Sequence, residues 1–128
     1  MNLLILSFQF FILKMASIKI TKTKNSKLKS VDFSNLGFGK VFSDHMLVCD
    51  YINGQWGNAE IIPFQSMSLM PSAKIFHYGQ SIFEGMKAYK DIELKTWLFR
   101  PDENFKRLNK SANRLAIPEV PRNIFFDG

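Results

Sequence analysis

The sequence predicts an α+β fold, in which short antiparallel strand pairs are combined with helices. Short apolar runs rich in β-branched and aromatic residues alternate with turn signals, and a later segment has apolar residues at helical spacing. The expected element order is strand, strand, short helix, strand, strand, helix. Because no linker or internal repeat divides residues 38–128, we expect a single domain there, and 128 residues are enough to bury a core.

The first predicted strand pair surrounds residues 53 and 54. Residues 45–51 form a short apolar run with β-branched and aromatic side chains. The dipeptide Asn53-Gly54 follows, and it is typical of type I′ hairpin turns because both central residues need a positive φ. Residues 60–62 then predict a second strand, which ends at Pro63 because proline has no N–H to donate.

The middle of the chain predicts a loop, a short helix and a second strand pair. Residues 65–74 have the composition of a loop, and residues 78–83 are expected to form a short helix that Gly85 ends. Residues 86–90 alternate in polarity and predict a strand. A short connection joins it to a partner strand at residues 96–99.

The strongest helix signal begins at Pro101. Proline in the first helical turn costs nothing, and Asp102 and Glu103 complement the positive end of the helix dipole. Apolar residues then recur at three- and four-residue spacing until Pro118, which predicts one apolar face. The members of this face are Phe105, Leu108, Ala112 and Leu115.

The formal net charge of +6 is concentrated at the N-terminal end of the chain. Residues 1–31 hold six lysines and no acidic residue, whereas the remainder has eleven basic and eleven acidic residues. We therefore expect a basic, flexible leader over residues 1–37 and no nucleic-acid partner. A nucleic-acid binder that depends on residues 1–31 is the rival interpretation.

Other features bear on the start of the chain, its compartment and metals. The apolar run at residues 2–13 is too short to span a bilayer and lacks a leading positive charge, so we expect translation to start at Met15, with a signal or anchor as the alternative. The single cysteine, Cys49, fits a reducing, cytoplasmic location. His45 and His77 lie far apart in the sequence without metal-ligand spacing, so no metal is expected.

Three segments occur in a characteristic order. Residues 38–47 read Phe-Gly-Lys-Val-Phe-Ser-Asp-His-Met-Leu, residues 83–89 read Phe-Glu-Gly-Met-Lys-Ala-Tyr, and residues 98–101 read Leu-Phe-Arg-Pro. Together they strongly resemble the branched-chain amino-acid aminotransferases, which are fold type IV pyridoxal-phosphate enzymes, over about residues 33–128. The resemblance implies that residues 38–128 are the small N-terminal domain, incomplete at its C-terminus, of an enzyme that moves an amino group between Leu, Ile or Val and 2-oxoglutarate.

The resemblance also implies roles for individual residues. Arg107 matches the family arginine that holds the phosphate of pyridoxal 5′-phosphate, a role that suits the charged, forked guanidinium. The alternative is a solvated helix face on which Arg107 pairs with Glu103 four residues earlier. Phe38 matches a residue that lines the pocket for the aliphatic substrate side chain, and Tyr78 matches one that crosses a dimer interface to the neighbouring site. Core packing is the alternative for both aromatic residues.

No catalytic residue is assigned within the chain. The Schiff-base lysine of the family would lie beyond Gly128, and Lys87 and Lys90 match positions that are not catalytic in the family. We therefore expect the chain to be inactive by itself. Phe83 is a weaker candidate for the edge of the substrate pocket, and Arg100 is expected to have a structural position at the helix start.

Two rival functions remain open from the sequence. One is another enzyme of the fold type IV group, also called class IV, either a D-amino-acid aminotransferase or an aminodeoxychorismate lyase. The other is a non-catalytic interaction module that pairs with an intact subunit. The resemblance further implies a homodimer for the full-length enzyme, and it does not rank Leu, Ile and Val as substrates.

Overall fold

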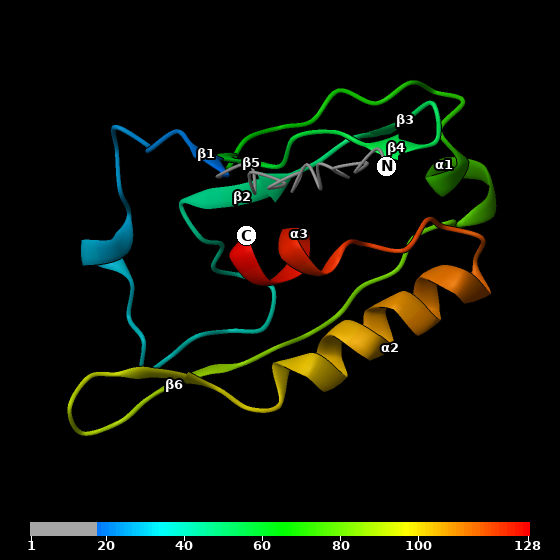
Figure 1. The fold of residues 1–128 in the computed structure, drawn as a ribbon. Coiled ribbons are helices and arrows are strands. Elements are labelled where there is room, and N and C mark those ends of the chain that lie inside the picture. Colours follow the sequence, from blue (N-terminus) through cyan, green and yellow to red (C-terminus); the bar gives the residue numbers. More distant parts are fainter. Residues whose placement is uncertain (1–17) are drawn as a thin grey trace, which may run out of the picture.

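The computed structural model describes residues 18–128, so the expected start at Met15 and the apolar run at residues 2–13 lie outside the described residues. Within that range the strands form a three-stranded sheet and two two-stranded ribbons, accompanied by helices (Figure 1). This arrangement confirms the predicted combination of helices and antiparallel strand pairs. Among residues 18–128, the structure contains no helix with the length and hydropathy of a membrane span.

The three-stranded sheet has the order β1-β5-β2. Its strands are β1 (Lys19–Ile20), β2 (His45–Val48) and β5 (Glu60–Pro63). Strand β2 pairs antiparallel with β5, with His45 opposite Pro63, and β1 pairs parallel with the other edge of β5. The strands around residues 45–48 and 60–62 are therefore confirmed as partners.

Part of the segment expected to be a flexible leader is attached to this sheet. Besides the strand Lys19–Ile20, the backbone N–H of Thr23 donates a hydrogen bond to His45 Nε2 at 2.9 Å. The hydroxyl of Ser26 donates to Asp44 Oδ2 at 2.6 Å. These contacts hold Thr23 and Ser26 at the start of β2, and the division of the chain at residue 37 stays a prediction.

The turn predicted at residues 53 and 54 is present. It joins β3 (Tyr51–Ile52) to β4 (Gln55–Trp56), which pair antiparallel. Asn53 has a φ of 53° and Gly54 a φ of 80°, as a type I′ turn requires. The strand expected over residues 45–51 is thus divided into two shorter strands.

The short helix lies earlier than expected. Helix α1 spans Lys74–Tyr78 and ends at Gly79, whose left-handed φ of 58° breaks the helix. The prediction of a helix over residues 78–83 that ends at Gly85 was therefore wrong. Gly79 adopts the terminating conformation first, and residues 79–87 form neither helix nor strand.

The second predicted strand pair is confirmed with shorter bounds. Strand β6 (Ala88–Lys90) pairs antiparallel with β7 (Thr96–Leu98), with Tyr89 opposite Trp97. The indole Nε1 of Trp97 donates to Asp91 Oδ2 at 2.7 Å and so closes the connection between the strands.

Helix α2 spans Pro101–Arg114 and confirms the strongest helix prediction. Asp102 and Glu103 lie in its first turn, as the sequence indicated. Ala112 on the predicted apolar face is completely buried, whereas Leu115 just beyond the helix is 40% exposed.

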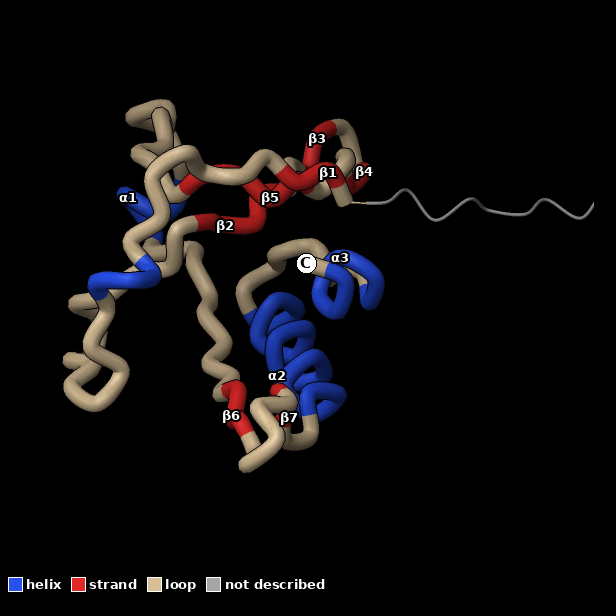
Figure 2. The backbone as a smooth tube through the Cα atoms, turned by 90° about the vertical axis from the view of Figure 1, so that its left-hand side faces the viewer, coloured by secondary structure: helices blue, strands red, loops and turns tan. Residues whose placement is uncertain are grey.

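Two further helical segments complete the described chain. The short 3₁₀ helix η1 spans Leu28–Ser30, and α3 spans Arg122–Asp127. Figures 1 and 2 show α3 on the side of α2 that faces the sheet. The ring of Phe105 on α2 lies 5.4 Å from that of Phe125 and 5.7 Å from that of Phe126, so aromatic contacts join the two helices.

The described residues bury little apolar surface. Among residues 18–128, the buried hydrophobic residues are Ala112 and Ile124. Phe38, Phe83 and Ile92 are each at least 92% exposed. Although 128 residues are enough to bury a core, residues 18–128 bury few apolar side chains, and much of their aromatic content faces outward.

Candidate functional site

The residue predicted to bind a phosphate, Arg107, forms a two-point ion pair. It lies in the second turn of α2, and its Nε donates to Glu84 Oε2 at 2.7 Å while its Nη2 donates to Glu84 Oε1. Glu84 belongs to the irregular segment at residues 79–87. The ion pair therefore joins the Phe-Glu-Gly motif to the helix that follows Leu-Phe-Arg-Pro.

Other donors hold the Glu84 carboxylate in place. Asn104 Nδ2 donates to Oε1 at 3.0 Å, and the backbone N–H of Gly85 donates to the same oxygen at 2.9 Å. The Glu84 side chain is only 8% exposed, whereas that of Arg107 is 65% exposed. The hydrogen bond from Arg107 is the main reason why the pKa of Glu84 falls to about 2.

The rival interpretation of Arg107 as a partner of Glu103 does not match the structure. Glu103 accepts a hydrogen bond from Lys106 Nζ at 2.9 Å instead. The sequence did not indicate Glu84 as the partner, because the two residues are 23 positions apart. One signal was present: Glu84 directly follows the apolar pair Ile82-Phe83, and a carboxylate in such a setting needs a partner.

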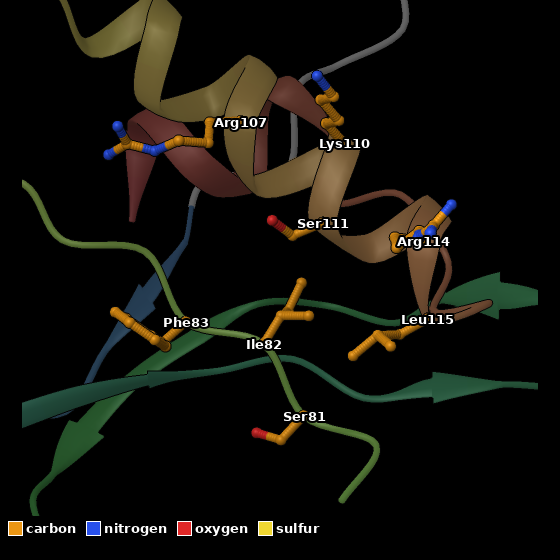
Figure 3. A pocket seen from close by; sticks show the side chains of 8 residues that line it. All are labelled: Ser81, Ile82, Phe83, Arg107, Lys110, Ser111, Arg114 and Leu115. Carbon is orange, nitrogen blue, oxygen red and sulfur yellow. The ribbon is translucent and has the colours of Figure 1, made fainter.

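An open pocket lies between α2 and the segment at residues 81–83. Its volume is about 580 Å³, which is within the range of small-molecule sites. Figure 3 shows Ser111 and Leu115 on the helix side that faces Ile82, while Lys110 leads away from it. The residues that line the pocket are Ser81, Ile82, Phe83, Arg107, Lys110, Ser111, Arg114 and Leu115.

The other predicted site residues do not line this pocket. Phe38 is fully exposed, and Tyr78, the last residue of α1, is 83% exposed. Neither aromatic residue is among those that line the pocket, and their substrate-binding roles stay predictions. Phe83 lines this pocket, and its place at the edge of a substrate pocket stays a prediction. Arg100 has a left-handed φ of 50° directly before α2, which fits a structural position.

The sequence is similar to several curated proteins that are all named branched-chain-amino-acid aminotransferases. The chain is 48% identical over 104 residues to the cytosolic branched-chain-amino-acid aminotransferase of Saccharomyces cerevisiae, a match covering 80% of this chain and 27% of the yeast protein. It is 43% identical over 112 residues to branched-chain-amino-acid aminotransferase 2 of Bacillus subtilis, covering 87% of this chain and 30% of the relative. No protein-family model matches the chain.

A third relative has a matching name. The branched-chain-amino-acid aminotransferase of Mycolicibacterium smegmatis is 48% identical over 95 residues, which is 73% of this chain and 26% of the relative. This similarity places the chain in the class of aminotransferases. Within that class it belongs to the branched-chain-amino-acid aminotransferase family. It spans less than a third of the length of these three relatives.

Proposed function

We propose that this chain contributes the phosphate-binding part of a transaminase that uses pyridoxal 5′-phosphate. The enzyme would exchange an amino group between Leu, Ile or Val and 2-oxoglutarate, and residues 38–128 would belong to its small fold type IV domain. The two-point ion pair of Arg107 is the observation that carries this proposal, because it holds a permanent cation at the edge of a pocket of suitable size.

The residues of the pocket fit a phosphate group. Among residues 18–128, Nη1 of Arg107 has no hydrogen-bond partner, so its two N–H groups can donate to an anion. The hydroxyl groups of Ser81 and Ser111 line the same pocket and are further donors. When bound, the cofactor would supply the electron sink for amino-group exchange, and this chain's residues would bind and orient its phosphate.

Phe38 and Tyr78 are proposed to contact the aliphatic side chain of the substrate. Both are largely exposed aromatic rings, which can contribute apolar contacts once another surface covers them. Tyr78 would reach the neighbouring active site in a homodimer. We also propose a cytoplasmic location, which the single cysteine, Cys49, supports.

The names of the relatives favour this proposal over the rival class IV enzymes. The three relatives described above are branched-chain enzymes, rather than D-amino-acid aminotransferases or aminodeoxychorismate lyases. The native protein that contains this chain should therefore transfer the amino group of Leu to 2-oxoglutarate faster than it transfers the amino group of D-alanine to 2-oxoglutarate. The opposite preference would decide for a rival.

Cofactor binding is tested with pyridoxamine 5′-phosphate, which has no aldehyde to react with surface lysines. Titration is followed by ³¹P NMR for the parent chain, Arg107→Ala and the control Lys106→Ala, which removes a neighbouring charge outside the pocket. Arg107→Ala should weaken binding about tenfold or more, because charge-assisted hydrogen bonds are worth about 1.5–3 kcal/mol. The control should stay within about twofold of the parent.

Two results would contradict the proposal. One is a parent chain without affinity for the probe, and the other is equal affinity of the parent and Arg107→Ala. Absence of affinity together with co-purification of an intact aminotransferase subunit would support the interaction module instead.

A further inference from the structure

Glu84 is the fixed member of its ion pair with Arg107. Its side chain is 8% exposed, and Asn104 and the backbone of Gly85 hold it independently of the arginine. Arg107 is 65% exposed, and an exposed arginine side chain otherwise samples many rotamers, with about 2 kcal/mol of conformational entropy. The carboxylate therefore limits the motion of the arginine, rather than the reverse.

The geometry of the pair leaves one edge of the guanidinium available. Nε and Nη2 donate to the two oxygens of Glu84, and two such contacts fix both the position and the plane of the group. Nη1 lies at the other end of the planar group and has no partner among residues 18–128. A negative charge on Glu84 is therefore held away from the edge that an incoming anion would contact.

We infer that Glu84 is a positioning residue that fixes the guanidinium of Arg107 so that its remaining N–H groups meet a phosphate. The inference rests on the proposed function. Fixing the donor before the ligand arrives lowers the entropy lost on binding, which raises affinity without a new contact. Repulsion between Glu84 and the phosphate opposes this gain. The repulsion is limited because the carboxylate is paired with the edge of the Arg107 guanidinium that faces away from the phosphate.

The first test measures the mobility of Arg107 directly. The chain has four arginines, so their Nε–H resonances can be assigned in a ¹⁵N-labelled sample. Glu84→Gln should lower the ¹H–¹⁵N heteronuclear NOE of the Arg107 Nε–H. The control Glu103→Gln removes a carboxylate paired with Lys106 on the same helix and should leave this signal unchanged.

The second test measures affinity for inorganic phosphate in the same samples. Glu84→Gln should weaken binding about fivefold, and Glu103→Gln should leave it within about twofold. Arg107→Lys keeps the positive charge but removes the planar fork, so it should also weaken binding about fivefold or more. This second variant tests the geometry even where Glu84→Gln fails to fold.

The possible failures have different meanings. An unchanged NOE in Glu84→Gln, or phosphate affinity equal to the parent in Glu84→Gln or Arg107→Lys, overturns the inference while leaving phosphate binding by the parent intact. A parent chain that binds no phosphate overturns the proposed function, and the positioning role with it. A mobile Arg107 side chain with weaker phosphate binding in Glu84→Gln supports both.

Discussion

At the scale of single residues, the carboxyl group of Glu84 couples a motif in an irregular segment to a helix. The hydrogen bond from Arg107 is the largest cause of its lowered pKa of about 2, against an ordinary value of 4.5. Because the ionised form is favoured in the folded chain, the pair contributes stability above pH 4.5. That contribution is lost as the pH falls from 4.5 through about 2.

Removing Arg107 should return the Glu84 carboxyl toward its ordinary pKa. In a ¹³C NMR titration, its carboxyl resonance should have a midpoint near 2 in the parent chain and a clearly higher midpoint in Arg107→Ala. Glu103 is the internal control, because its pKa is lowered mainly by the hydrogen bond from Lys106 and should not change. Equal Glu84 midpoints in the two chains would contradict the ion pair.

Asn109 performs a structural role that the sequence did not reveal. Its side chain is only 9% exposed, its Nδ2 donates to the carbonyl of Val120 at 3.0 Å, and the N–H of Val120 donates to its Oδ1 at 2.8 Å. Asn109→Ala leaves two partly buried backbone groups unpaired, at a cost of about 1–3 kcal/mol. We expect the Val120 amide to exchange with solvent about tenfold faster or more. The exposed Asn113→Ala should change this rate little.

At the scale of elements, the turn between β3 and β4 depends on backbone conformation. Gly54 has a φ of 80°, where an added Cβ meets no neighbouring atom, so the cost of a side chain is conformational. Gly54→Ala should destabilise the hairpin by about 1–2 kcal/mol. The NOEs between the Tyr51 and Trp56 rings, which lie 5.2 Å apart, should weaken. Gly57→Ala, where φ is not positive, should retain them.

Local signals predicted most elements because their causes are local. The turn at Asn53-Gly54 and the start of α2 at Pro101 each follow from the conformational preference of the residues themselves. Helix α1 was misplaced because two glycines, Gly79 and Gly85, are both able to end a short helix. The left-handed backbone conformation of Gly79 shows that this glycine ends the helix.

The candidate site likewise contains one residue that a local motif indicates and one partner that depends on a long-range contact. The place of Arg107 in a family motif made it the candidate for phosphate binding; it lines a pocket in the structure, and its role stays a prediction. The sequence indicated that the Glu84 carboxylate needs a partner but not which one, because a contact across 23 positions depends on how the segment at residues 79–87 packs against α2. The roles of Phe38 and Tyr78 depend on surfaces that the described residues do not provide.

At the scale of the whole molecule, hydrogen bonds connect segments that are far apart in the sequence, and the apolar core is small. Trp56 Nε1 donates to the carbonyl of Glu119 at 2.8 Å, and Gln80 Nε2 donates to the carbonyl of Leu115 at the same distance. Each such bond contributes only about 0.5–1.5 kcal/mol net. Burial of one large apolar side chain contributes about 1.5–3 kcal/mol, and few are buried among residues 18–128.

The limited burial predicts weak cooperativity for the chain studied alone. A compact domain of this length would unfold with a heat-capacity change of about 1.5 kcal/mol/K, because that change follows the apolar surface newly exposed to water. Differential scanning calorimetry of the chain should give a clearly smaller value and a broad transition. Exposed rings such as Phe38 and Phe83 should bind the dye ANS before heating. A sharp transition with the full heat-capacity change and no dye binding would show that the exposed aromatic residues pack together in solution.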